Sequence, residues 1–273
     1  MRIRRSLLLI ALTLAGCAWS EPRPSPAPRY DAFVLDQGGI IRGNRSRREL
    51  ALVFTADEYA DGCAHIRQTL ADRGIRAAFF LTGRFLRDPE RAVCARGLLA
   101  DGHYLGPHSD EHLLYAPWED RGRSLVSREE FTRDLLRNIA ELRAIGALPD
   151  DEPVYFIPPY EWYNAQHVRW AAELGVIVIN FTPRIGSNRD WAPEGHRSFV
   201  PSQQIIDDIF AFESRDPAGL NGAILLLHLG SQRQDKTYRL LGPLLDGLRD
   251  RGYRFPRIDV MLRRTPYGVE HYP

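Results

Sequence analysis

Lysine is almost absent from this chain of 273 residues, because Lys236 is the only one and arginine supplies every other basic side chain. Schiff-base chemistry needs a lysine amine, so a lysine-centred mechanism is nearly excluded. No Gly-x-Gly-x-x-Gly or Walker-type loop follows an apolar run, which argues against a nucleotide-binding sheet. The formal charge is only +1, from 36 basic and 35 acidic side chains, and it provides no basic field for nucleic acid. Nucleic acid is therefore not expected as a partner.

The chain also lacks an apolar run long enough to span a bilayer, which takes roughly 20 residues. Its longest apolar stretch near the start, Leu7 to Leu14, follows three arginines and is typical of an export signal over residues 1–16. The stretch Leu14-Ala15-Gly16-Cys17 resembles a bacterial lipobox, which implies that Cys17 carries a lipid. A secretory signal followed by an incidental cysteine remains the alternative.

Residues 17–30 contain proline at every second position from Pro22 to Pro28, which favours an extended spacer behind Cys17. We therefore expect an exported, membrane-anchored lipoprotein of the cell envelope, periplasmic or in the outer membrane if the cell is Gram-negative. A single domain is expected over 31–273. The remaining cysteines, Cys63 and Cys94, would meet an oxidising compartment, but buried free thiols are as compatible with the sequence as a disulfide. No protein partner is identifiable.

Short apolar runs alternate with amphipathic stretches along this domain. The runs predict seven strands, at 51–54, 77–81, 103–106, 154–157, 176–181, 223–227 and 253–258. The clearest helix is predicted over 127–145, where Ser127 and Glu130 form a capping-box pattern and Gly146 follows the last turn. Such alternation indicates an α/β fold with a mainly parallel sheet, and about seven strands favour a distorted (β/α) barrel over an open sheet.

Reactive side chains follow the predicted strands, where the carboxyl ends of parallel strands meet at one rim. Asp57 and Asp61 follow the first run, His108 and His112 the third, Tyr160 the fourth, and His228 ends the sixth. His108 and His112 are four residues apart, so both imidazoles can face one ion, and a carboxylate can complete the site. Two neutral nitrogens with a carboxylate favour zinc, or cobalt or nickel, over magnesium and calcium.

Four stretches carry a resemblance to a known family: the acidic end of the first strand, Gly-His-Tyr-Leu-Gly-Pro-His-Ser-Asp-Glu-His from Gly102, Pro-Pro-Tyr ending at Tyr160, and Ile-Leu-Leu-Leu-His ending at His228. In this order they resemble the polysaccharide deacetylases, carbohydrate esterase family 4 with its NodB-like domain, over nearly all of 50–260. The resemblance implies a divalent metal held by one aspartate and two histidines, a second aspartate as base, and a histidine as general acid. His108 and His112 match the ligand pair and His228 the acid. Tyr160 matches the residue whose N–H stabilises the oxyanion.

Two departures from the family's motifs affect the expected site. Thr55 and Ala56 stand where the family has two adjacent aspartates, so we assign Asp57 to the metal and Asp61 to the base, with exchanged roles as the alternative. A further alternative is that both aspartates only cap the next helix. Ile157 stands where the family has an arginine that orients the base, so Glu161, Asp190 or another polar group must replace it.

Four aromatic residues in the loops are candidates for stacking on sugar rings, although each alone is as compatible with core packing: Trp118, Trp162, Tyr163 and Trp191. Together these features predict a metal-dependent hydrolase that removes acetyl groups from N-acetylated sugars. The alternatives are a non-catalytic carbohydrate-binding lipoprotein on the same fold and an esterase that removes O-acetyl groups.

Overall fold

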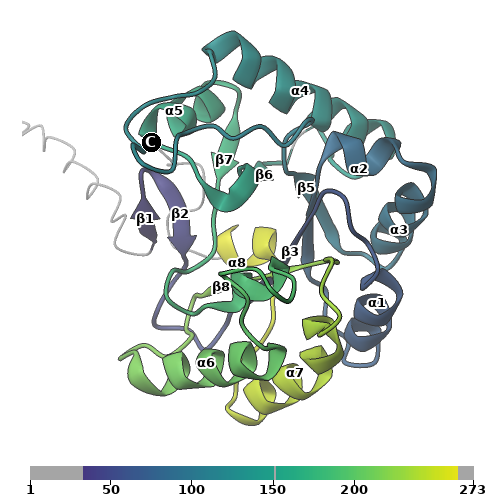
Figure 1. Ribbon diagram of the computed structural model, residues 1–273, viewed down its shortest axis with the longest axis vertical. Coiled ribbons are helices and arrows are strands. Elements are labelled where there is room, and N and C mark those ends of the chain that lie inside the picture. The colour runs from purple at the N-terminus through teal and green to yellow at the C-terminus, as the bar shows by residue number, and fades with distance from the viewer. Residues whose placement is uncertain (1–32, 151, 264–273) are drawn as a thin grey trace, which may run out of the picture.

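Parallel strands lie at the centre of the molecule and helices surround them (Figure 1). The computed structural model describes residues 33–150 and 152–263. The predicted signal, Cys17 and the proline-rich spacer lie outside the described residues. The α/β class with a parallel sheet is confirmed.

Six of the seven predicted strands are present and all six pair in parallel. They are β3 (Ala51–Ala56), β4 (Ala78–Leu81), β5 (Tyr104–Pro107), β6 (Val154–Phe156), β7 (Val176–Val178) and β8 (Ile224–His228). One sheet has the order β5-β4-β3-β8, and β6 and β7 form a second sheet. The Ile157 N–H donates to the Pro107 carbonyl over 3.4 Å, which links the β5 edge to the β6 segment.

A short antiparallel hairpin, β1 (Val34–Asp36) and β2 (Gly39–Arg42), was not predicted from the sequence. Its two-residue turn, Gln37-Gly38, has φ of 53° and 93°, and a glycine between two short apolar runs was the available signal. Isolated bridges pair Ile40 with Ile179 and Arg42 with Ala223. The hairpin thus connects the β6-β7 sheet to β8, so that the strands surround one core in the manner of a distorted barrel.

The seventh predicted strand, 253–258, is wrong. Arg254 makes only an isolated bridge to Glu49, and helix α8 (Ile258–Arg263) begins within the predicted strand. Pro256 has no N–H to donate, so it removes a hydrogen bond that a strand at this place would need.

The remaining helices cover the outside of the strands (Figure 1). They are α1 (Cys63–Ala71), α2 (Gly83–Arg87), α3 (Pro89–Ala100), α4 (Arg128–Ala144), α5 (Ala165–Glu173), α6 (Ser202–Arg215) and α7 (Leu241–Asp250), with short 3-10 helices η2 (Pro159–Glu161), η3 (Ser187–Trp191) and η4 (Thr237–Leu240). The predicted capping box at Ser127 and Glu130 is present. Within 33–150 and 152–263, no helix combines the length and apolar character needed to cross a membrane.

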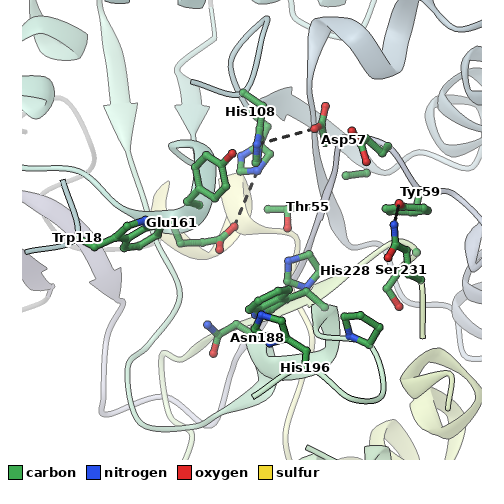
Figure 2. A pocket seen from close by; sticks show the side chains of 18 residues that line it. Thr55, Asp57, Tyr59, His108, Trp118, Glu161, Asn188, His196, His228 and Ser231 are labelled. Carbon is green, nitrogen blue, oxygen red and sulfur yellow. Dashed lines mark hydrogen bonds and ion pairs between the residues drawn. The ribbon is translucent and has the colours of Figure 1, made fainter. Parts of the chain in front are cut away.

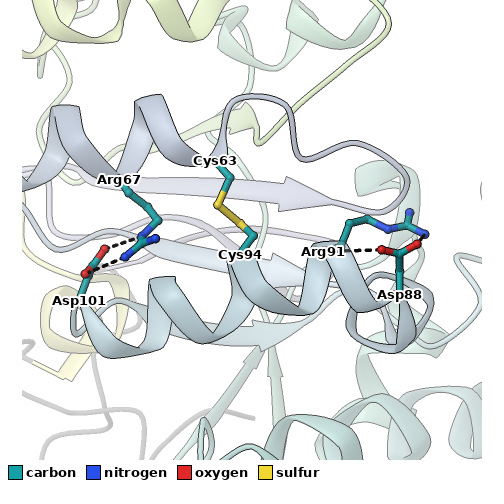
Figure 3. Close-up of a disulfide and its surroundings, with 6 residues drawn as sticks. All are labelled: Cys63, Arg67, Asp88, Arg91, Cys94 and Asp101. Carbon is teal, nitrogen blue, oxygen red and sulfur yellow. Dashed lines mark hydrogen bonds and ion pairs between the residues drawn. A yellow bond between two sulfur atoms is a disulfide. The ribbon is translucent and has the colours of Figure 1, made fainter.

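The pairing of the two cysteines, which the sequence left open, is decided by the packing of α1 against α3. Cys63 and Cys94 form a disulfide between these helices, with Cα atoms 6.2 Å apart (Figure 3). Ion pairs lie on either side, and one of them, Arg67 with Asp101 at 2.7 Å, also joins α1 to the end of α3.

Two buried histidines away from the strand ends make stability depend on pH. Burial lowers the pKa of both His103 and His167 to about 4. Below about pH 6.5 these histidines are therefore protonated in the unfolded chain but stay neutral in the folded chain. The free energy of unfolding decreases as the pH falls from there. We expect the unfolding free energy to fall by about 2 kcal/mol for each histidine between pH 7 and pH 5.

Urea unfolding at the two pH values measures this loss. A His103→Gln variant should lose less stability between pH 7 and pH 5 than the wild type. His65→Gln, at an exposed position of α1, should leave the pH dependence unchanged. Equal pH dependence in wild type and His103→Gln would contradict the assignment.

Candidate active site

A cleft of about 750 Å³ opens where β3, β5 and β8 end (Figure 2). Its lining combines titratable side chains with aromatic ones: Thr55, Asp57, Glu58, Tyr59, His108, His112, Trp118, Tyr160, Glu161, Asn188, Trp191, His196, His228 and Gln232, among others. The carboxyl ends of parallel strands meet at this edge, which is why residues far apart in sequence share one wall.

Helix α4 holds the loop that carries the two predicted metal ligands. The Asn138 side chain accepts a hydrogen bond from the His108 N–H at 2.9 Å, and Asp134 accepts one from the Glu111 N–H at 2.9 Å. Within the loop, the Ser109 hydroxyl accepts the His112 N–H at 2.9 Å, and both Ser109 and His112 have positive φ. This conformation is strained for a non-glycine residue, so the surrounding hydrogen bonds must hold it in place.

His108 and His112 face each other with ring centroids 5.0 Å apart. His108 Nδ1 lies 2.7 Å from the Ile157 carbonyl, so this nitrogen carries the hydrogen and leaves Nε2 as the acceptor. Burial lowers the pKa of His108 well below its usual range and that of His112 to about 4. Both imidazoles are therefore neutral near pH 7.

Asp57, the predicted third ligand, lines the cleft but already has partners. Its carboxylate forms an ion pair with Arg84 and accepts a hydrogen bond from the Thr82 hydroxyl at 2.9 Å. His112 Nδ1 lies 3.8 Å from Asp57 Oδ2.

The expected metal site is not assembled by these side chains. His108 Nε2 lies 3.9 Å from Glu161 Oε1, whereas His112 faces Asp57. The two imidazoles thus face different carboxylates, and the described residues contain no group of three or more His, Cys, Asp or Glu side chains that could hold a metal ion. The donors are of the chemical type that zinc prefers, but as placed they do not fit a bound ion.

Asp61, the predicted base, lies outside the residues that line the cleft. Its carboxylate pairs with Lys236 Nζ at 2.7 Å and accepts the Ser231 N–H at 3.0 Å. Asp61 therefore ties the loop after β8 to the loop after β3, and the chain's single lysine holds it there.

His228, the predicted general acid, ends β8 and rests on Asp190. His228 Nδ1 lies 2.6 Å from Asp190 Oδ1, and the His228 N–H donates to Oδ2 at 2.9 Å. Burial opposes protonation of His228, but the charge of buried Asp190, its hydrogen bond and the charge of Glu161 together raise the pKa of His228. Two hydrogen bonds that His228 donates to one carboxylate thus fix the ring and favour its charged form, as a proton donor requires.

Glu161 is the acidic residue that lies deepest in the site beside the histidines. It was expected only as one candidate to orient a base, yet its own carboxylate points into the cleft beside Thr55 and His108 (Figure 2). Burial, followed by the charge of Asp190, raises the pKa of Glu161 to about 7, although His228 opposes the rise. The available signal was an acidic residue directly after Pro-Pro-Tyr, at the end of the fourth strand.

The aromatic residues divide into two groups. Tyr160, Trp118 and Trp191 line the cleft and are 45%, 58% and 44% exposed. Trp162 and Tyr163, predicted to bind sugar, are not among the lining residues. Trp162 instead packs behind Trp118 with ring centroids 5.5 Å apart, and the Tyr163 ring is fully buried.

The family model of the polysaccharide deacetylases matches residues 42–179, which span the strand-end loops of β3, β5 and β6. The chain belongs to the polysaccharide deacetylase family, whose members are generally metal-dependent.

Individual relatives agree with this assignment. The chain is 26% identical to a peptidoglycan-N-acetylglucosamine deacetylase of Bacillus cereus over 232 residues, which cover 84% of this chain and 96% of that protein. Two solved structures share the fold. One is a family 4 carbohydrate esterase pseudoenzyme from Bacillus anthracis, with a TM-score of 0.65 and 18% identity over 83% of this chain and 69% of that one. The other is the chitin deacetylase of the fungus Colletotrichum lindemuthianum, with a TM-score of 0.62 and 19% identity over 88% and 96%.

Proposed function

We propose that this protein is a hydrolase that removes acetyl groups from N-acetylated sugars of a polysaccharide or oligosaccharide. The observation that carries the proposal is the pairing of His228 with Asp190, because it positions His228 in the same cleft as His108, His112 and Glu161. A cleft of this size, open at a strand-end rim and edged with exposed aromatic rings, suits a sugar rather than a small metabolite. The deacetylase relative supports the same substrate class.

The chain's own residues supply a proton where amide cleavage needs one. When the C–N bond breaks, its electron pair stays on nitrogen, and the amine leaves readily only if it is protonated. His228 Nδ1 is hydrogen-bonded to Asp190, so Nε2 is the nitrogen available to a substrate. We assign His228 as the general acid and the Tyr160 N–H as a donor to the oxyanion.

Trp118 offers the most exposed aromatic surface of the cleft, and its packing on Trp162 holds the ring in place. We expect Trp118→Ala to raise KM for an N-acetylglucosamine oligomer about tenfold through lost stacking, with kcat within about threefold of the wild type. Leu136→Ala, at an exposed apolar position of α4 outside the cleft, is the control and should leave both constants unchanged. A changed kcat with an unchanged KM would contradict a binding role.

A divalent metal, zinc first and cobalt or nickel as alternatives, stays a prediction for this chain. As placed, the side chains of His108, His112 and Asp57 do not fit an ion. Elemental analysis of the purified protein before and after dialysis against a chelator measures its presence directly. A stoichiometric ion would mean that His112 and Asp57 move on binding, and a protein without metal would agree with the arrangement described here.

Acetate release tests the proposed function. The substrates are chitin oligomers, peptidoglycan fragments and acetyl-xylan, assayed with and without added zinc. We expect acetate from at least one N-acetylated substrate. Release from acetyl-xylan alone would assign O-acetyl esterase activity instead, and no release from any substrate would refute the hydrolase.

A non-catalytic carbohydrate-binding protein is the second candidate. The observation that favours it is the end of β3, where Thr55 and Ala56 line the cleft and neither can serve as a carboxylate base. In that case the protein would bind these oligomers and release no acetate. Isothermal titration beside the acetate assay separates the two.

The location of the protein is also a proposal. We infer that Cys17 carries a lipid and that the domain is exported to the cell envelope. The disulfide between Cys63 and Cys94 supports export, because such bonds persist in oxidising compartments. Fractionation of cells that express Cys17→Ser tests it: the variant should leave the membrane fraction while the wild type stays there.

A further inference from the structure

The last two residues of β3, Thr55 and Ala56, present no carboxylate to the cleft, although the hydrolysis proposed above needs a base. Thr55 is buried, and its hydroxyl lies beside the Glu161 carboxylate. Asp57 is paired with Arg84, and Asp61 is bound to Lys236 outside the cleft. Glu58 also lines the cleft but is exposed, so the buried carboxylate at this place comes from another element.

Glu161 brings a carboxylate to this place from η2, after β6. Its carboxylate lies next to the Thr55 side chain, with Oε1 3.9 Å from His108 Nε2, and the Glu161 side chain is only 12% exposed (Figure 2). Within the described residues, no arginine or lysine forms an ion pair with the Glu161 carboxylate, in contrast to Asp57 and Asp61.

The backbone of Glu161 is held in a conformation that local preferences oppose. Tyr160 and Glu161 have φ of 58° and 54°, in the left-handed region that non-glycine residues avoid. Asn180 holds the turn, because its side-chain N–H donates to the Glu161 carbonyl at 2.8 Å, and the Glu161 N–H donates to the Pro158 carbonyl at 2.9 Å. Strain of this kind persists where the surrounding structure imposes it, and it is concentrated at functional sites.

From this geometry we propose that Glu161 replaces the missing acidic side chains at the end of β3 and is the general base of the reaction. The proposal rests on the proposed deacetylase function. The Glu161 carboxylate takes one proton from water while the water oxygen bonds to the acetyl carbon. The C–N bond then breaks, its electron pair stays on nitrogen, and His228 gives that nitrogen a proton. Acetic acid and the free amine leave, and the acid gives its proton to the amine in solvent, which yields acetate and an ammonium group. The proton held by Glu161 returns to His228 through solvent.

The test compares four variants in the acetate assay. Glu161→Gln keeps the shape of the side chain and removes the base, so kcat should fall about 10²- to 10⁴-fold while KM stays within about threefold. Glu161→Asp should recover part of the loss. Thr55→Asp combined with Glu161→Gln returns a carboxylate to β3 and should exceed Glu161→Gln by at least about tenfold. Glu90→Gln, on the exposed face of α3, is the matched control and should keep the wild-type rate.

A stability measurement shows whether the variants fold. Glycine adopts a positive φ without strain. The thermal midpoint of Glu161→Gly should therefore rise by about 2–4 °C, while acetate release is lost. Glu161→Gln that keeps more than a third of the wild-type kcat would overturn the base assignment and leave the deacetylase function standing. It would also be overturned if Glu161→Gln raised KM without lowering kcat, and neither Glu161→Asp nor Thr55→Asp combined with Glu161→Gln restored activity. A folded wild type that releases no acetate would overturn the proposed function and the base together.

Discussion

Replacing His228 by asparagine is expected to lower kcat for acetate release by about 10²- to 10⁴-fold, the usual contribution of a positioned proton donor. Asparagine cannot carry the proton that the departing amine needs. Asp190→Asn should lower kcat less, because the ring stays in place but loses the negative charge that favours its protonated form. KM should change little in either variant, since the proton moves only as the bond breaks.

Steady-state kinetics on one N-acetylglucosamine oligomer measures both effects. His65→Gln, on the exposed face of α1, is the control and should match the wild type. If His228→Asn keeps most of the wild-type kcat, the assignment of the general acid is wrong. Circular dichroism and a thermal midpoint for each variant separate lost chemistry from lost folding.

Removal of the disulfide has the largest expected effect on stability. The bond joins residues 31 apart in sequence, and for a loop of that length the loss of its constraint on the unfolded chain amounts to about 3–4 kcal/mol. The double variant Cys63→Ser and Cys94→Ser should therefore unfold at a markedly lower urea concentration. Both positions are buried, so the two hydroxyls add a further cost.

Urea unfolding of the variant, of the wild type and of the wild type kept in reductant gives the comparison. Reduced wild type and the serine variant should unfold at similar concentrations. Arg67→Gln breaks the exposed ion pair with Asp101 between the same two helices, and it should cost less than about 1 kcal/mol. A serine variant as stable as the oxidised wild type would contradict the assigned role of the bond.

The strand-end residues show how far sequence reasoning reaches in this fold. His108, His112, Tyr160 and His228 were predicted to share one rim, and all four line the cleft. The reason is geometric, because parallel strands with helical crossovers bring their carboxyl ends to the same side. Their chemical roles stay proposals, since position alone does not assign a proton or a ligand.

The acidic residues show where that reasoning fails. Asp57 and Asp61 follow β3 in sequence, and proximity along the chain made them the candidates for ligand and base. Their arginine and lysine partners come from other segments, at Arg84 and Lys236, and a single sequence does not reveal such pairs. The orientation of Glu161 was not predicted, for the complementary reason. A left-handed turn directs its side chain into the cleft, and no local preference predicts that turn for Tyr160 and Glu161.

The sequence by itself determined the α/β class, six of the strands, the capped helix over Arg128–Ala144 and the family, because periodicity, caps and motifs are local properties of the chain. Only the tertiary structure decided which carboxylate faces the histidines, which aromatic rings stay exposed and that Cys63 meets Cys94. Each of these depends on contacts between segments far apart in sequence, where packing and charge pairing select one partner among several of the same chemical type.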